Sequence, residues 1–135
     1  MKYQEFLKRV KGEAGLESLE DAARITRVVI ETLGERVSRT ERHELAAQVP
    51  HELREYLSGR CEKDRYMLEE FYDRVTARAD IGYPNAVRQT LAVMKVLQEA
   101  VTPGELQDIL GELPDQYAEL FGREPESPLS PTVVR

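Results

Sequence analysis

The sequence predicts an all-α protein built from a duplicated four-helix repeat, with about eight helices sharing one core. Landmarks of residues 6–59 return in residues 70–122, offset by 65 residues at the start and by 64 from the middle onward. Apolar residues recur at helical spacing in both copies, and no segment shows the period-two alternation of a strand. Because one copy is too small to bury its apolar face well, we expect the two copies to pack on each other.

The first copy predicts helices at about 2–12, 19–34, 39–48 and 50–58. Ser18 with Asp21, and Ser38 with Glu41, have the spacing of a capping box, in which two side chains satisfy each other's backbone N–H groups. Pro50 ends the third helix and can begin the fourth, because proline lacks the N–H that a helix interior needs.

The second copy predicts helices at about 62–79, 84–99 and 103–112, and a fourth that ends before Gly122. The helix at 62–79 is expected to be longer than its counterpart at 2–12, with Tyr66 or Met67 facing inward. Thr102 and Glu105 repeat the capping box of the first copy. Leu33 and Leu97 correspond, so we expect both to occupy equivalent buried positions.

The organisation along the chain is one all-helical domain over 1–122, with repeats at about 5–59 and 66–122, and a tail over 123–135. The tail carries three prolines among polar residues, so it cannot bury enough surface to offset its ordering entropy. We expect a flexible, disordered tail; the alternative is a short motif that docks on a partner or on the second repeat.

Charge is unevenly distributed. The net charge is −6; residues 1–59 contribute −1 and residues 60–135 contribute −5. A nucleic-acid-binding protein usually carries a basic stripe, because neutralising phosphates supplies most of the affinity. We therefore expect no nucleic-acid partner, and we expect any protein that meets the second repeat to be basic there.

Composition indicates a globular, water-soluble helical protein: 41% of residues are hydrophobic and 33% are charged. No stretch approaches a membrane span, and the N-terminus lacks the apolar core of a signal peptide, so a cytoplasmic location is expected. The single cysteine, Cys61, excludes an internal disulfide and a cysteine-based zinc site.

No catalytic, cofactor-binding or metal-binding residue is predicted. His43 and His51 lack metal-ligand spacing, and we expect both to be solvated surface residues. Cys61 is expected to be an ordinary thiol between the repeats, with a redox switch as the alternative. Glu41 and Glu105 correspond between the copies, and their capping role accounts for both.

Aromatic and basic side chains leave two further alternatives. The tyrosines could line a ligand groove, but they are more often half-buried with a solvated hydroxyl; they are Tyr66, Tyr72, Tyr83 and Tyr117. The arginines of the first copy could form a basic face, but interleaved glutamates favour a solvated face of mixed charge; they are Arg24, Arg27, Arg36, Arg39 and Arg42.

A set of landmarks recurs in the same order in both copies: Phe6 with Val10 and Phe71 with Val75, Leu33 with Val37 and Leu97 with Val101, and Val49-Pro50 and Leu113-Pro114. This ordered set resembles a bacterial family catalogued as domain of unknown function 2267, over about residues 5–122. The resemblance implies a small, duplicated, all-helical protein and supplies no activity.

We therefore expect a non-catalytic protein-interaction module with an adaptor or regulatory role. The alternative is a sensor that binds a small molecule or lipid in a pocket between the repeats. An enzyme is the least favoured class, because no catalytic constellation emerges from the residues. The oligomeric state does not follow from the sequence.

Overall fold

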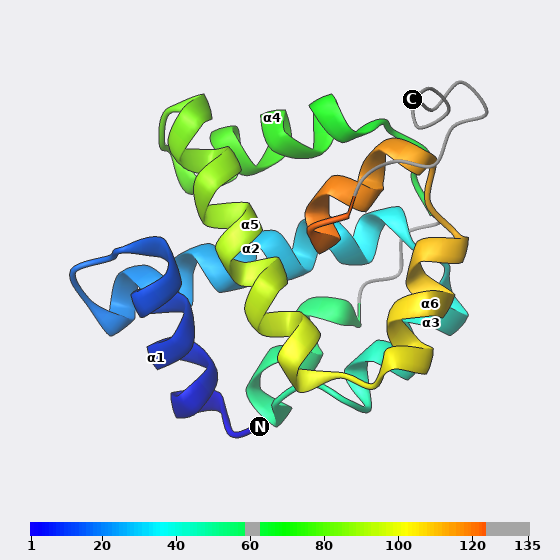
Figure 1. Cartoon of the computed structure of the whole chain (residues 1–135), viewed down its shortest axis with the longest axis horizontal. Coiled ribbons are helices and arrows are strands. Elements are labelled where there is room, and N and C mark those ends of the chain that lie inside the picture. Colours follow the sequence, from blue (N-terminus) through cyan, green and yellow to red (C-terminus); the bar gives the residue numbers. More distant parts are fainter. Residues whose placement is uncertain (59–62, 124–135) are drawn as a thin grey trace, which may run out of the picture.

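The two sequence repeats each form three α-helices followed by one 3₁₀ helix, in the same order (Figure 1). The structure is a computed structural model and describes residues 1–58 and 63–123. The helices of the first repeat are α1 (Tyr3–Ala14), α2 (Leu19–Arg36), α3 (Arg39–Ala46) and η1 (His51–Leu57). Those of the second are α4 (Leu68–Ala79), α5 (Tyr83–Ala100), α6 (Pro103–Gly111) and η2 (Asp115–Phe121). No strand occurs within the described ranges, which confirms the all-α prediction.

The helix boundaries follow the offsets seen in the sequence. The helices α1 and α4 are both 12 residues long and begin 65 positions apart, at Tyr3 and Leu68. The helices α2 and α5 are both 18 residues long and begin 64 positions apart, at Leu19 and Tyr83. The last helix of each repeat, η1 or η2, is a 3₁₀ helix of 7 residues.

The two repeats share one hydrophobic core, as expected. The helix α1 packs against α5 as well as α2, while α4 packs against α2 as well as α5. Figure 1 shows α5 crossing α2 near the centre of the molecule. Leu33 and Leu97 are both fully buried within the same cluster, as the correspondence between the copies predicts.

The helix predicted at 62–79 begins only at Leu68, so the expectation that it exceeds its counterpart in length was wrong. Residues 63–67 instead form a non-helical segment held by tertiary hydrogen bonds. The carbonyl of Tyr66 accepts bonds from Arg36 Nε at 2.7 Å and from the Tyr117 hydroxyl at 2.6 Å. The Asp64 N–H donates to the carbonyl of Glu35 at 2.8 Å. These contacts with other helices replace the local helical bonds.

The first helix of each repeat ends at one residue with left-handed backbone dihedral angles. Gly15 caps α1 with a φ of 64°, and Asp80 caps α4 with a φ of 55°. Their positions differ by 65, the offset of the helices they follow. Asp80 is the only non-glycine residue with positive φ that the structure describes.

Two of the sequence predictions fall outside the described residues. Cys61 and positions 124–135 of the tail belong to that part of the chain. Among the described residues, no helix combines the length and apolar character needed to cross a membrane.

Candidate functional site

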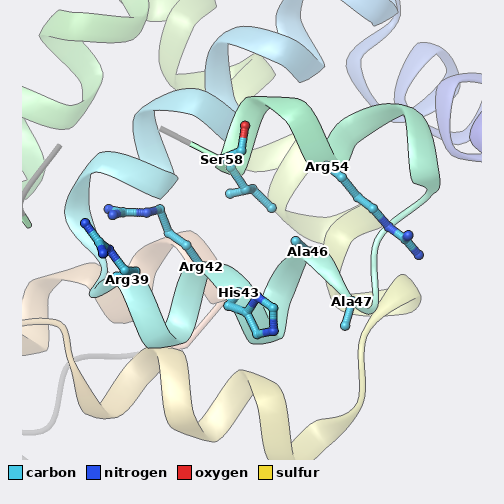
Figure 2. A pocket seen from close by; sticks show the side chains of 8 residues that line it. Arg39, Arg42, His43, Ala46, Ala47, Arg54 and Ser58 are labelled. Carbon is cyan, nitrogen blue, oxygen red and sulfur yellow. The ribbon is translucent and has the colours of Figure 1, made fainter. Parts of the chain in front are cut away.

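The helix α3 borders two distinct features, a basic hollow on one side and a cluster of carboxylates on the other. The hollow has a volume of about 770 Å³ and lies between α3 and η1 (Figure 2). Its lining comprises Arg39, Arg42, His43, Ala46, Ala47, Arg54, Leu57 and Ser58. We call it the α3–η1 hollow.

The three arginines of the α3–η1 hollow differ in how they are held. Arg42 is buried, and its Nη1 donates to the carbonyls of Gly34 at 2.9 Å and Val37 at 3.2 Å. Arg39 and Arg54 are exposed, and neither has an ion pair within the described ranges. In Figure 2, Arg39 and Arg42 extend toward one end of the hollow and Arg54 lies at the other. The hollow therefore presents unneutralised positive charge at both ends.

The second repeat provides an internal comparison for this hollow. A smaller hollow of about 300 Å³ adjoins α6 and η2; besides Arg123, its lining includes Gln107, Leu110, Gly111 and Ala118. The last four residues correspond to His43, Ala46, Ala47 and Arg54. The positions of Arg39 and Arg42 are taken by Pro103 and Leu106. Because the same chain path forms in the second repeat without arginines at these positions, the exposed Arg39 and Arg54 are not needed to form the hollow, whereas Arg42 also bonds to backbone carbonyls.

On its other side, α3 packs against α6, so that corresponding acidic residues of the two repeats converge. Carboxylate oxygens of Glu41, Glu44, Glu105 and Asp108 all lie within 4.8 Å of one another. Glu41 corresponds to Glu105, and Glu44 corresponds to Asp108, each at an offset of 64. We call these four residues the carboxylate cluster.

The capping boxes are only half formed, so capping does not account for Glu41 and Glu105 as we expected. The Ser38 and Thr102 hydroxyls do accept bonds from the N–H groups of Glu41 and Glu105, both at 3.2 Å. The reciprocal bonds are absent, because each cap N–H is taken by the opposite repeat. Two further contacts satisfy them: Ser38 N donates to Glu112 Oε1 at 2.7 Å, and Thr102 N donates to Gln48 Oε1 at 2.7 Å.

The two central carboxyl groups are therefore buried without their expected partners. Glu41 is 6% exposed and Glu105 is 4% exposed, and the Oε2 atom of each is buried without a hydrogen-bond partner. Burial, followed by the hydrogen bond and the charge of Glu41, raises the pKa of Glu105 to about 8. Burial also raises the pKa of Glu41 above its ordinary value, while its hydrogen bond with Glu105 acts in the opposite direction.

The arginines predicted to form a solvated face divide into two groups. Arg24 and Arg27 are exposed and pair with Asp21 and Glu31, as expected for a mixed-charge surface. Arg36 and Arg42, however, are 4% and 5% exposed and donate to backbone carbonyls, so that prediction was wrong for both. The signal for burial was available, because the corresponding residues of the second repeat are Ala100 and Leu106.

The histidines and tyrosines can also be placed. His43 and His51 are exposed, as predicted, and His43 additionally lines the α3–η1 hollow. The Tyr66 and Tyr117 side chains are buried, and their hydroxyls donate to backbone carbonyls rather than to water. Tyr83 is 42% exposed.

The fold and these two features define a duplicated all-α protein whose repeats have diverged in one hollow while keeping a shared acidic contact. The family profile described as "Uncharacterized conserved protein (DUF2267)" matches residues 3–120, and the chain belongs to this family. A comparison with curated proteins finds no match.

Proposed function

We propose that this chain is a non-catalytic protein-interaction module whose α3–η1 hollow binds an acidic segment of a partner protein. One observation carries the proposal: Arg39, Arg42 and Arg54 line a hollow whose counterpart in the second repeat has no arginine at those positions. Exposed Arg39 and Arg54, which the chain path does not need, stand around a concave surface, and a concave surface with a few placed polar groups favours a binding site.

The chemistry of the hollow favours a carboxylate-bearing ligand. A guanidinium group presents a planar fork of N–H donors that matches a carboxylate, and such charge-assisted bonds are stronger than neutral ones. The exposed Arg39 and Arg54 stand at opposite ends of the hollow, which suits two acidic side chains of one extended peptide. The Arg42 guanidinium donates to two backbone carbonyls, and these bonds fix its position at the edge of the hollow.

A short acidic segment fits this molecule better than a nucleic acid does. The whole chain carries a net charge of −6, and residues 60–135 carry −5 of it. A long polyanion would extend over the acidic second repeat, whereas a short peptide can remain within the first.

The alternative of a small-molecule or lipid sensor receives less support from the hollow that lies between the repeats. That hollow has a volume of about 270 Å³, and Glu31, Gly34, Glu35, Arg42, Glu55, Tyr56 and Arg78 line it. Most of these side chains are charged, whereas pockets for small molecules and lipids are predominantly apolar.

The proposal can be tested with a fluorescent decapeptide rich in glutamate and aspartate, using anisotropy at about 50 mM salt, where attraction is least screened. We expect saturable binding that weakens at least several-fold as salt rises and in the double variant Arg39→Gln/Arg54→Gln. The matched control, Arg24→Gln/Arg27→Gln, removes two exposed arginines outside the hollow and should bind like wild type.

Three results would contradict the proposal. These are no peptide binding by wild type, equal loss of binding in both double variants, and duplex DNA or RNA that binds more tightly than the peptide in the same buffer. The third result would make the hollow a phosphate-binding surface and replace the protein-interaction reading.

A further inference from the structure

The carboxylate cluster brings together more negative charge than its surroundings compensate. None of its four members has an ion pair within the described ranges, and the nearby Lys63 pairs instead with Glu112, at 3.8 Å. Like charges gathered this closely repel strongly, and the repulsion grows where burial excludes water. Such a group needs positive charge from another source to be stable when ionised.

Two atoms of the cluster point to a ligand independently of the charge. The Oε2 atoms of Glu41 and Glu105 are buried with no donor from the rest of the protein, on side chains that are more than nine-tenths buried, and the hydrogen bond between the two carboxyl groups forms only while one of them is protonated. A buried acceptor left unsatisfied is costly, and native proteins rarely keep one without a reason. The capping role that would normally occupy these carboxylates is filled by Glu112 and Gln48 from the opposite repeats.

The spacing of the oxygens indicates the size of the ion. Ca²⁺ binds oxygen ligands at about 2.3–2.6 Å, so two oxygens on opposite sides of one ion lie about 4.6–5.2 Å apart. The four carboxylates each offer an oxygen, and none of these atoms is more than 4.8 Å from another. Mg²⁺ needs about 2.0–2.1 Å and a near-ideal octahedron, so its opposite ligands lie only about 4.0–4.2 Å apart and the 4.8 Å spread of these oxygens suits the larger ion better.

The donor set indicates the class of ion. All four ligands are carboxylates, which are hard oxygen donors that suit Ca²⁺, Mg²⁺ and Mn²⁺. Among the residues that the structure describes, no histidine belongs to the cluster, so the zinc and copper classes are not favoured. Glu44 and Asp108 are exposed and leave the cluster open on its solvent side, where an ion can enter and keep water ligands.

We propose that Glu41, Glu44, Glu105 and Asp108 bind one calcium-sized divalent cation between α3 and α6. Two ligands come from each repeat, at positions three residues apart on one face of a short helix. The cation therefore joins the two repeats at the end of the molecule where α3 and α6 lie together. This inference goes beyond the proposed function and depends on different residues from those of the α3–η1 hollow.

The test is isothermal titration of the full chain, freed of metal by a chelator, with CaCl₂ and separately with MgCl₂. We expect one Ca²⁺ per chain with a dissociation constant below about 1 mM, and weaker binding of Mg²⁺. A thermal melt should show a higher melting temperature with CaCl₂ than with NaCl of equal ionic strength, because the ion binds only the folded chain.

Two double variants separate the site from general acidity. Glu44→Gln/Asp108→Asn changes only exposed side chains, so it should fold normally and lose Ca²⁺ affinity at least tenfold. Glu41→Gln/Glu105→Gln should abolish the heat of binding. The matched control, Glu17→Gln/Asp73→Asn, removes two exposed acids elsewhere and should bind Ca²⁺ like wild type.

The outcomes decide the proposal in either direction. No binding of Ca²⁺ by wild type up to about 10 mM, beyond the weakest biological calcium sites, would overturn it. Unchanged binding in the folded Glu44→Gln/Asp108→Asn variant would also overturn it, because the ion would then lie elsewhere. Equal or tighter binding of Mg²⁺ would contradict the assignment of a calcium-sized site.

Discussion

Single residues in matching positions of the two repeats perform the same task with different side chains. Gly15 and Asp80 both take the left-handed conformation that ends a helix, with φ values of 64° and 55°. Glycine adopts this conformation without steric cost. In aspartate, the Cβ atom comes too close to the following carbonyl oxygen. The second repeat therefore retains local strain that the first has avoided.

Replacing Asp80 by glycine should consequently stabilise the protein, by about 0.5 kcal/mol after allowing for the greater freedom of glycine in the unfolded chain. At the matching position of the first repeat, Gly15→Ala adds a Cβ to a left-handed residue and should destabilise the protein by about 1 kcal/mol. Urea unfolding of both variants beside wild type measures the difference. A loss of stability in Asp80→Gly would mean that the aspartate side chain makes a contact worth more than the strain.

Ser38 and Thr102 both cap helices, but Ser38 makes one contact more. Its hydroxyl accepts from Glu41 N and also donates to Glu112 Oε2 at 2.7 Å. Ser38→Ala and Thr102→Ala should each cost roughly 0.5–2 kcal/mol, the usual loss for a helix cap. Because of its second bond, Ser38→Ala should be the more damaging of the two. Thermal melts showing the opposite order would contradict the contribution of Glu112.

At the scale of elements, apolar periodicity and capping spacing were sufficient to predict most helices, because both depend on residues close in sequence. Leu33 and Leu97 fell in equivalent buried positions, and the hydroxyls of Ser38 and Thr102 cap as predicted. The late start of α4 was missed because hydrogen bonds from Arg36 and Tyr117, which are distant in the chain, hold the carbonyl of Tyr66 outside the helix.

The candidate sites were missed for a related reason. The spacing of neighbouring residues predicts that Glu41 and Glu105 cap their own helices. It cannot show that Glu112 and Gln48 of the opposite repeats bond to the cap N–H groups instead. The repeat alignment did contain a usable signal, because acidic residues three positions apart occur on both α3 and α6. Likewise, a charged residue aligned with an apolar one, as Arg42 is with Leu106, indicates burial or a special role.

The central helices of the two repeats should contribute comparably to the core. Leu33 on α2 and Leu97 on α5 are both fully buried in the same cluster. Truncating either to alanine should cost about 2–5 kcal/mol, the range found for a buried leucine. Chemical denaturation measures both variants, and a value within a few tenths of wild type for either one would contradict the shared core.

At the scale of the whole molecule, stability should depend on pH through the contact between α3 and α6. The pKa of Glu105 is about 8 in the folded chain, against an ordinary value of 4.5. The folded state therefore binds more protons between these values, and linkage requires stability to fall as pH rises from about 4.5 to about 8. Glu41, Glu44 and Asp108 face this carboxyl and strengthen the effect.

Glu105→Gln isolates this contribution, because the amide mimics the protonated acid and cannot ionise. In the presence of a chelator, the wild-type melting temperature should fall between about pH 5 and pH 8 relative to that of the variant. At pH 8 the variant should be the more stable of the two. Parallel melting curves across this range would contradict a raised pKa at Glu105.

Each repeat completes the start of a helix in the other, since Glu112 accepts from Ser38 N and Gln48 accepts from Thr102 N. Amide protons at the start of a helix lack an acceptor within that helix and usually exchange readily with water. Here a side chain of the opposite repeat accepts each of the two protons, so each is protected while that contact holds. Hydrogen exchange at Ser38 and Thr102 should therefore report how often these two contacts between the repeats open, with slower exchange at the part-buried Ser38 than at the exposed Thr102.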